Sequence, residues 1–169
     1  MGKWNDTDVP LAYLITFRTY GTWLGGDERV STDKQHNRYK GAFADLNIIR
    51  EQQQAIELKS EPFVMNGRSR RAVREAIEEV CRYREWLLHA LNVRTNHAHS
   101  VISGPDPDKI LGDLKRYSTR RLRELDLWKH EHSPWSDKGS KRNLWNANHI
   151  SSATNYVLLG QGSDLPEFD

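Results

Sequence analysis

Two histidines separated by one residue, His97 and His99, lie in a segment whose residue types predict a β-strand over 97–103. Side chains at i and i+2 of a strand point to the same face of a sheet. The two imidazoles can therefore converge on one divalent ion, because neutral imidazole is a common metal ligand. The competing interpretation is a pair of hydrogen-bonded histidines on a polar sheet face.

A second pair with the same spacing, His130 and His132, flanks Glu131 in a polar segment followed by Ser133-Pro134. The sequence predicts no regular element there that would fix the geometry of the pair. We expect this segment to be a solvated loop.

A tyrosine, Tyr117, lies at the edge of the apolar stripe of a helix predicted over 107–125. Arg120 and Arg121 are its i+3 and i+4 neighbours. Their charges favour an anionic substrate and a more acidic phenol. The competing interpretation is an ordinary boundary tyrosine beside a solvated basic face.

Together, the histidine pair, the tyrosine and the basic surround favour phosphodiester chemistry. A metal on His97 and His99 would polarise a scissile phosphate as a Lewis acid. Tyr117 would attack phosphorus and form a covalent phosphotyrosine. Basic side chains would hold the nucleic-acid backbone, and the residues expected to do so are Lys115, Arg116, Arg120, Arg121, Lys141 and Arg142.

The elements that must position these residues alternate between strands and helices. Strands are predicted over residues 11–20, 86–94, 97–103 and 143–146. Helices are predicted over residues 46–58, 69–84, 107–125 and 150–159, and loops over 21–45 and 128–142. The expected N-caps of the last three helices are Ser69, Asp106 and Asn148. This β-α-β-β-α-β order with a terminal helix predicts an α+β fold, a ferredoxin-like antiparallel sheet with helices packed on one face.

Length and charge narrow the class of protein. The 169 residues predict a single domain, 1–169, with a core at about 11–162. With 25 basic and 23 acidic residues, the net charge of +2 excludes a strongly basic nucleic-acid coat protein but not a local basic site. No apolar run is long enough for a membrane span, and the first residues lack the apolar core of a signal peptide. Cys81 is the single cysteine, so intramolecular disulfides are excluded and a cytoplasmic setting is expected.

Residues 95–102, TNHAHSVI, resemble the HUH motif (His–hydrophobic–His) of single-tyrosine transposases. Residues 114–121 resemble the helix that carries their nucleophile. The stretches 13–24, 86–94, 139–145 and 156–162 agree as well, so the likeness extends over about 11–162. The chain is similar to REP-associated tyrosine transposases and to insertion sequence 200-like transposases.

The resemblance implies a ferredoxin-like enzyme that nicks single-stranded DNA beside hairpins, with Mg²⁺ or Mn²⁺ as cofactor. It leaves a 5′-phosphotyrosine and a free 3′-OH that can later be rejoined to DNA. His97 and His99 would be the metal ligands and Tyr117 the nucleophile. Family members often act as dimers, so a homodimer is compatible with the resemblance.

Two positions depart from the family pattern. Arg121 stands where a polar third metal ligand is expected, and a guanidinium cannot bind a metal. Asn96, Asn148 and His149 are the alternative candidates for this ligand. The middle residue of the motif, Ala98, is small for its role.

Two other functions stay open. One is a domesticated hairpin or single-stranded DNA-binding protein that does not cleave, for which arginine and aromatic side chains suffice. The other is a metal-binding protein without a nucleic-acid partner, against which the clustered basic residues argue.

Overall fold

The computed structural model describes residues 9–22, 57–162 and 165. The predicted loop over 21–45 and the predicted helix over 46–58 fall almost entirely outside these residues. No helix in the described ranges is long and apolar enough to cross a membrane.

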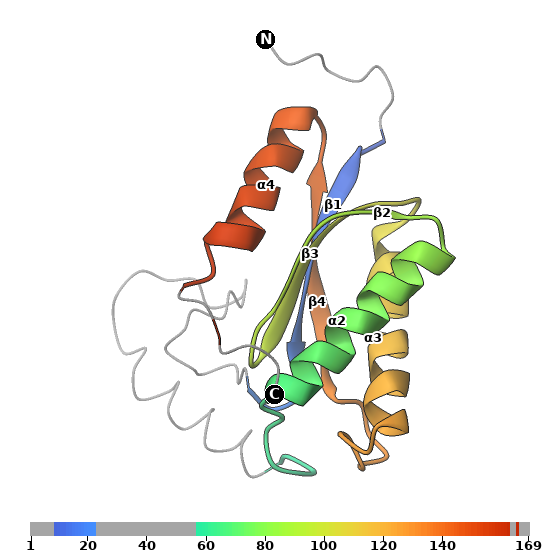
Figure 1. Cartoon of the computed structure of the whole chain (residues 1–169), viewed down its shortest axis with the longest axis vertical. Coiled ribbons are helices and arrows are strands. Elements are labelled where there is room, and N and C mark those ends of the chain that lie inside the picture. The colour runs from blue at the N-terminus through green and yellow to red at the C-terminus, as the bar shows by residue number, and fades with distance from the viewer. Residues whose placement is uncertain (1–8, 23–56, 163–164, 166–169) are drawn as a thin grey trace.

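One four-stranded antiparallel sheet forms the centre of the molecule, with strand order β2-β3-β1-β4 (Figure 1). The elements follow one another along the chain as β1 (Ala12–Thr19), α2 (Gly67–Tyr83), β2 (Leu87–Val93), β3 (His97–Ser103), α3 (Pro107–Glu124), β4 (Trp135–Leu144) and α4 (Ala147–Leu159). The α+β class and the predicted order of elements are confirmed.

Helices cover both faces of the sheet (Figure 1). Tyr13, Ile15 and Phe17 of β1 join the larger core beneath α2 and α3. The alternate residues Ala12 and Leu14 pack with the α4 side chains in a smaller cluster. The expectation of helices on one face thus holds for α2 and α3, whereas α4 lies on the other. The physical reason is that β1 and β3 carry apolar residues on both faces, and each face must be covered.

The strand before α4 is longer than expected. A loop was predicted over 128–142, but residues 135–144 form β4, which pairs with β1 at the edge of the sheet. Trp135 and Leu144 are buried at its two ends, and most side chains between them are exposed. An edge strand whose side chains are mostly exposed has no alternation of apolar and polar residues. The alternation from which strands are predicted is therefore absent in β4.

Two of the three predicted caps move by two or three residues. Asn66, not Ser69, caps α2, and its side chain accepts a hydrogen bond from the Ser69 backbone at 2.9 Å. Asn146, not Asn148, caps α4. A cap side chain reaches the amide two or three residues further on. At α2 the donating residue, Ser69, was taken for the cap, whereas at α4 the donor to Asn146 is His149 and the predicted cap Asn148 lies in the first turn. Asp106 caps α3 as predicted.

Candidate active site

His97 and His99 lie side by side on β3, on the face covered by α4. Their ring centroids are 4.6 Å apart, and the shared face predicted from the spacing is confirmed. Each Nδ1 has a partner at 2.6 Å: Asn96 Oδ1 for His97 and Thr16 Oγ1 for His99. Since a carbonyl oxygen only accepts, His97 Nδ1 carries the proton and its Nε2 keeps a lone pair.

The environment keeps both imidazoles neutral. Burial, the neighbouring His97 and Arg18 lower the pKa of His99 to about 4. Burial also lowers the pKa of His97, against a smaller opposing effect of Gln161. A neutral imidazole is the form that binds metal ions, so the pair is ready to bind without losing protons.

Gln161 supplies a third donor atom beside the pair. Its Nε2 donates to the Tyr156 carbonyl at 3.3 Å, which fixes the amide so that Oε1 faces His97. The distance from Oε1 to His97 Nε2 is 3.4 Å. Two lone pairs that face each other in this way are satisfied by a shared cation, so the residues fit a divalent ion. In the described part of the chain no cluster of three or more His, Cys, Asp or Glu could hold a metal.

Of the candidates for a third ligand named from the sequence, two make other hydrogen bonds and one is exposed on α4. Asn96 orients His97 through Nδ1. Asn148 lies in the first turn of α4 and is exposed. His149 Nδ1 accepts from the Trp145 backbone at 3.3 Å. Gln161 was missed because it follows α4, and only the placement of α4 on the histidine face brings it to β3.

Tyr156 of α4 is the tyrosine beside the histidines. Its ring centroid lies 5.7 Å from that of His99, and 48% of the residue is exposed. Sequence reasoning missed this tyrosine, although the next residue, Val157, is fully buried and anchors α4 on the sheet. The signal was available in the apolar pair Ala153 and Val157, whose i, i+4 spacing turns one face of α4 toward a sheet.

Tyr117 lies on α3, on the other side of the sheet (Figure 1). Its ring packs against the larger core, with the guanidinium carbons of Arg116 and Arg120 at 5.8 and 4.7 Å from the ring centroid. The structure therefore does not bring Tyr117 to His97 and His99 within one chain.

A cavity of about 640 Å³ opens between α4 and strands β1 and β4. His99, Tyr156, Arg18 and Arg142 line it, and none of its lining residues in the described chain is Asp or Glu. Among the described residues, the lining thus offers hydrogen-bond donors and the guanidinium of Arg142 to an anion.

The arginines of α3 are neutralised by acidic residues instead. Arg121 donates to Glu79 at 2.6 Å, and Arg120 lies 3.5 Å from the other oxygen of the same carboxylate. Arg116 donates to the buried Asp113 at 2.6 Å. All three lie on the α2–α3 side of the sheet.

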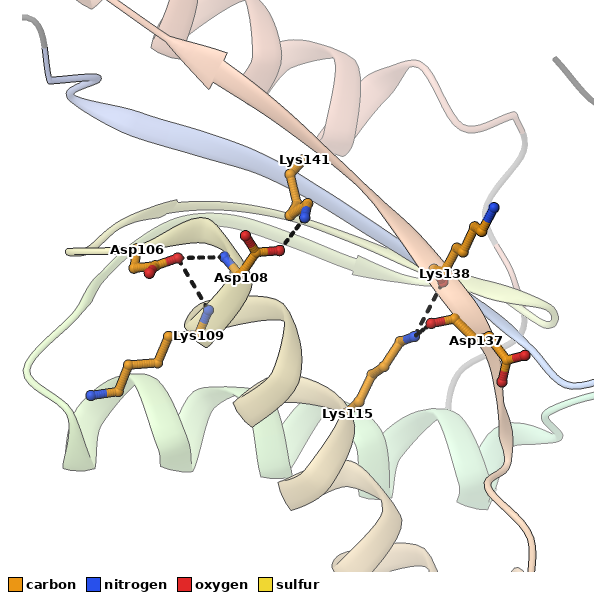
Figure 2. A network of polar contacts seen from close by, with 7 residues as sticks. All are labelled: Asp106, Asp108, Lys109, Lys115, Asp137, Lys138 and Lys141. Atoms are coloured by element: carbon orange, nitrogen blue, oxygen red, sulfur yellow. Dashed lines mark hydrogen bonds and ion pairs between the residues drawn. The ribbon is translucent and has the colours of Figure 1, made fainter. Parts of the chain in front are cut away.

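Two of the predicted DNA-binding lysines connect α3 to β4 (Figure 2). The Lys115 ammonium donates to three consecutive carbonyls, of Ser136, Asp137 and Lys138, at 2.7, 3.4 and 3.1 Å. Lys141 pairs with Asp108 in the first turn of α3. Of the six predicted contacts, all of which the structure describes, Arg142 is the one that lines the cavity.

The second histidine pair lies in an ordered loop. The rings of His130 and His132 stack with centroids 5.2 Å apart. Arg123 donates to the carbonyls of residues 130–132, and Trp128 Nε1 donates to the His132 carbonyl at 2.8 Å. The predicted solvated loop is confirmed, since this segment forms no helix or strand and His130 and Glu131 are exposed. These side-chain contacts satisfy its backbone carbonyls.

Comparison with known proteins supplies the family. The family model described as "Transposase IS200 like" matches residues 55–157, more than half of the chain. The chain belongs to this family. It is similar to a REP-associated tyrosine transposase solved with a REP hairpin, with 14% identity, 95% of this chain and 72% of that chain covered, and a TM-score of 0.47. It is also similar to a candidate transposase from Deinococcus radiodurans R1, with 12% identity, 97% and 100% covered, and a TM-score of 0.47. No curated protein matches the chain.

Proposed function

We propose that this IS200-like transposase cuts and rejoins single-stranded DNA at hairpins, with Tyr156 as the nucleophile. The observation that carries the proposal is the position of Tyr156, 5.7 Å from His99 in ring centroids, in a cavity whose described lining residues include no Asp or Glu. Tyr117 was the nucleophile expected from the sequence, but it lies on the opposite face of the sheet from both histidines.

The reaction is a transesterification. Tyr156 Oη bonds to phosphorus as its phenolic proton departs, and the bond from phosphorus to the 3′ oxygen breaks. The 3′ oxygen takes up a proton and leaves as a hydroxyl, with the 5′ phosphate held on the tyrosine. Because one phosphodiester replaces another, the 3′-OH can reverse the step without an external energy source.

His97, His99 and Gln161 would hold the divalent ion, Mg²⁺ or Mn²⁺. When bound there, such an ion supplies Lewis-acid polarisation of the phosphate. The chain itself orients His97 through Asn96 and His99 through Thr16, and it keeps both imidazoles neutral by burial. The half-exposed Tyr156 is open to a strand entering the cavity.

A covalent adduct tests the proposal. The protein is incubated with a panel of single-stranded hairpins and Mn²⁺, and adducts are separated by denaturing electrophoresis. We expect an adduct with the wild type and with Tyr117→Phe, and none with Tyr156→Phe. Loss of the adduct in Tyr117→Phe, with its retention in Tyr156→Phe, would restore Tyr117 as the nucleophile.

A second candidate is a hairpin-binding protein that does not cleave. The described lining of the cavity, which includes Arg142 but no Asp or Glu, favours it equally, since phosphate binding by Arg142 needs no metal. This function is indicated if the wild type binds the hairpins but forms no adduct with any of them.

A further inference from the structure

The cavity extends well beyond Tyr156 along α4. His149, Ser152 and Tyr156 all line it, at spacings of three, four and seven residues that place them on one helix face. Seven residues rise about 10 Å along a helix axis. This length exceeds what one phosphate group can contact through hydrogen bonds of about 3 Å. The end near His149 is therefore free to bind another part of the strand.

Arg142 stands across the cavity from this end of α4. It is exposed, and no ion pair joins it to another residue in the described part of the chain. Its neighbour Lys141 points to the other face of the sheet and pairs with Asp108. Among the described residues, Arg142 thus brings a positive charge that no ion pair compensates to a cavity wall that holds no carboxylate.

His149 is held as a hydrogen-bond donor. The Trp145 backbone donates to Nδ1 at 3.3 Å, so Nε2 carries the proton in the neutral imidazole. The His149 backbone in turn donates to Asn146 Oδ1 at 2.9 Å, which fixes the residue in the first turn of α4. The neutral ring therefore still presents an N–H.

We propose that Arg142, His149 and Ser152 form a second phosphate site, which binds a backbone phosphate of the single strand other than the one that Tyr156 attacks. A guanidinium, an imidazole N–H and a hydroxyl are donors that suit a phosphodiester. The strand then lies along α4, between this helix and β4. The inference rests on one part of the proposed function, namely that single-stranded DNA enters the cavity.

Salt-dependent binding tests the second site. The affinity for a dye-labelled single strand of mixed sequence is measured by fluorescence anisotropy over a range of salt concentrations. The variants are Arg142→Gln, His149→Gln and the double variant. The matched control is Lys109→Gln, which removes an exposed cation from α3 on the other face; its side chain points away from the network in Figure 2.

We expect Arg142→Gln to reduce the slope of log affinity against log salt by about 0.7, the contribution of one phosphate contact on a single strand. His149→Gln should weaken binding severalfold, because the variant loses the imidazole N–H that donates to the phosphate. The loss of affinity in the double variant should be smaller than the product of the fold-losses in the two single variants, because both residues contact one phosphate. Lys109→Gln should leave affinity and slope as in the wild type.

Two results would overturn the second site: an unchanged slope in Arg142→Gln, or losses from Arg142 and His149 that multiply independently. Adduct formation by the same variants separates this failure from that of the proposed function. A wild type that forms the Tyr156 adduct while Arg142→Gln keeps its slope contradicts the second site only. A wild type that forms no adduct while the slope changes as expected contradicts the nuclease and leaves the site standing.

Discussion

Arg121 and Glu79 join α3 to α2 through an ion pair of 2.6 Å, on the side of the sheet away from His97 and His99. The side chains are 32% and 41% exposed, so the pair is screened by solvent. The contact explains why an arginine is tolerated at a position where the family pattern led us to expect a metal ligand. The metal donors that we propose, His97, His99 and Gln161, lie on β3 and just after α4.

Arg121→Gln should therefore leave both the Mn²⁺ affinity and the DNA affinity unchanged. The free energy of unfolding should fall by less than about 1 kcal/mol, as for other partly exposed ion pairs. Calorimetric titration with Mn²⁺, anisotropy with single-stranded DNA and urea unfolding measure the three quantities. Tighter Mn²⁺ binding by the variant would show that Arg121 does lie at the metal site.

His97→Ala and His99→Ala should each weaken Mn²⁺ binding by more than about tenfold, since even the loss of an outer-shell partner costs that much. His130→Ala is the matched control, because its ring stacks on His132 in a loop fixed by Arg123 and Trp128. Calorimetric titration measures each affinity. The assignment fails if the His97 variant binds as the wild type does.

Whether a feature of the site can be predicted from the sequence depends on whether residues close together in the chain determine it. The spacing of His97 and His99 places them on one strand face because strand geometry is local. The choice between Tyr117 and Tyr156 depends on which face of the sheet each helix covers. Packing of Val157 and Ala153 against the sheet determines which face α4 covers. The residues next to these two in the sequence do not indicate which face that is.

At the scale of elements, β4 is held by contacts from α3. Lys115 reaches three successive carbonyls near its start, and Trp135 Nε1 donates to the Lys115 carbonyl at 3.1 Å. Burial lowers the pKa of Lys115, while Asp137 opposes this. Side chains of α3 therefore position β4, in addition to the backbone hydrogen bonds between β4 and β1.

Lys115→Met should destabilise the fold, because three carbonyls lose their ammonium donor. We expect a loss of about 1–3 kcal/mol, the range for hydrogen bonds to charged groups. Lys109→Met, at an exposed position on the same helix, should change stability by no more than about 0.5 kcal/mol. Urea unfolding compares the two. Equal stability of both variants would mean that water replaces the Lys115 contacts without cost.

The elements that the sequence predicted well are those with a buried apolar side. β1, β3 and α3 were placed within one or two residues: β1 alternates buried and half-buried residues, β3 buries a continuous run, and α3 buries an apolar stripe. β4 was largely missed because its polar side chains face solvent at the sheet edge. Its backbone pairing with β1 is a long-range contact that local patterns do not encode.

At the scale of the whole molecule, the reactivity of Cys81 measures whether the larger core is closed. It is 2% exposed, and burial, with a smaller effect of Glu78, raises the pKa of its thiol to about 12. We expect the native protein to react with a disulfide reagent at pH 8 only when α2 separates from the sheet. The rate should rise steeply across the urea transition. Rapid stoichiometric labelling of the folded protein would contradict this burial.

The two layers on either side of the sheet differ in how firmly they are attached. Eight residues of α2 are buried, whereas α4 buries Ala153 and Val157. Local opening free energies follow the apolar area that an element buries. Backbone amides of α4 should therefore exchange with deuterium well before those of α2, and bound single-stranded DNA should slow that exchange. If mass spectrometry finds the two helices equally protected, the layers open together. If α4 exchanges first, the helix that carries Tyr156 detaches while the rest of the domain stays folded, and the proposed nucleophile is present only in the fraction of molecules in which α4 is docked.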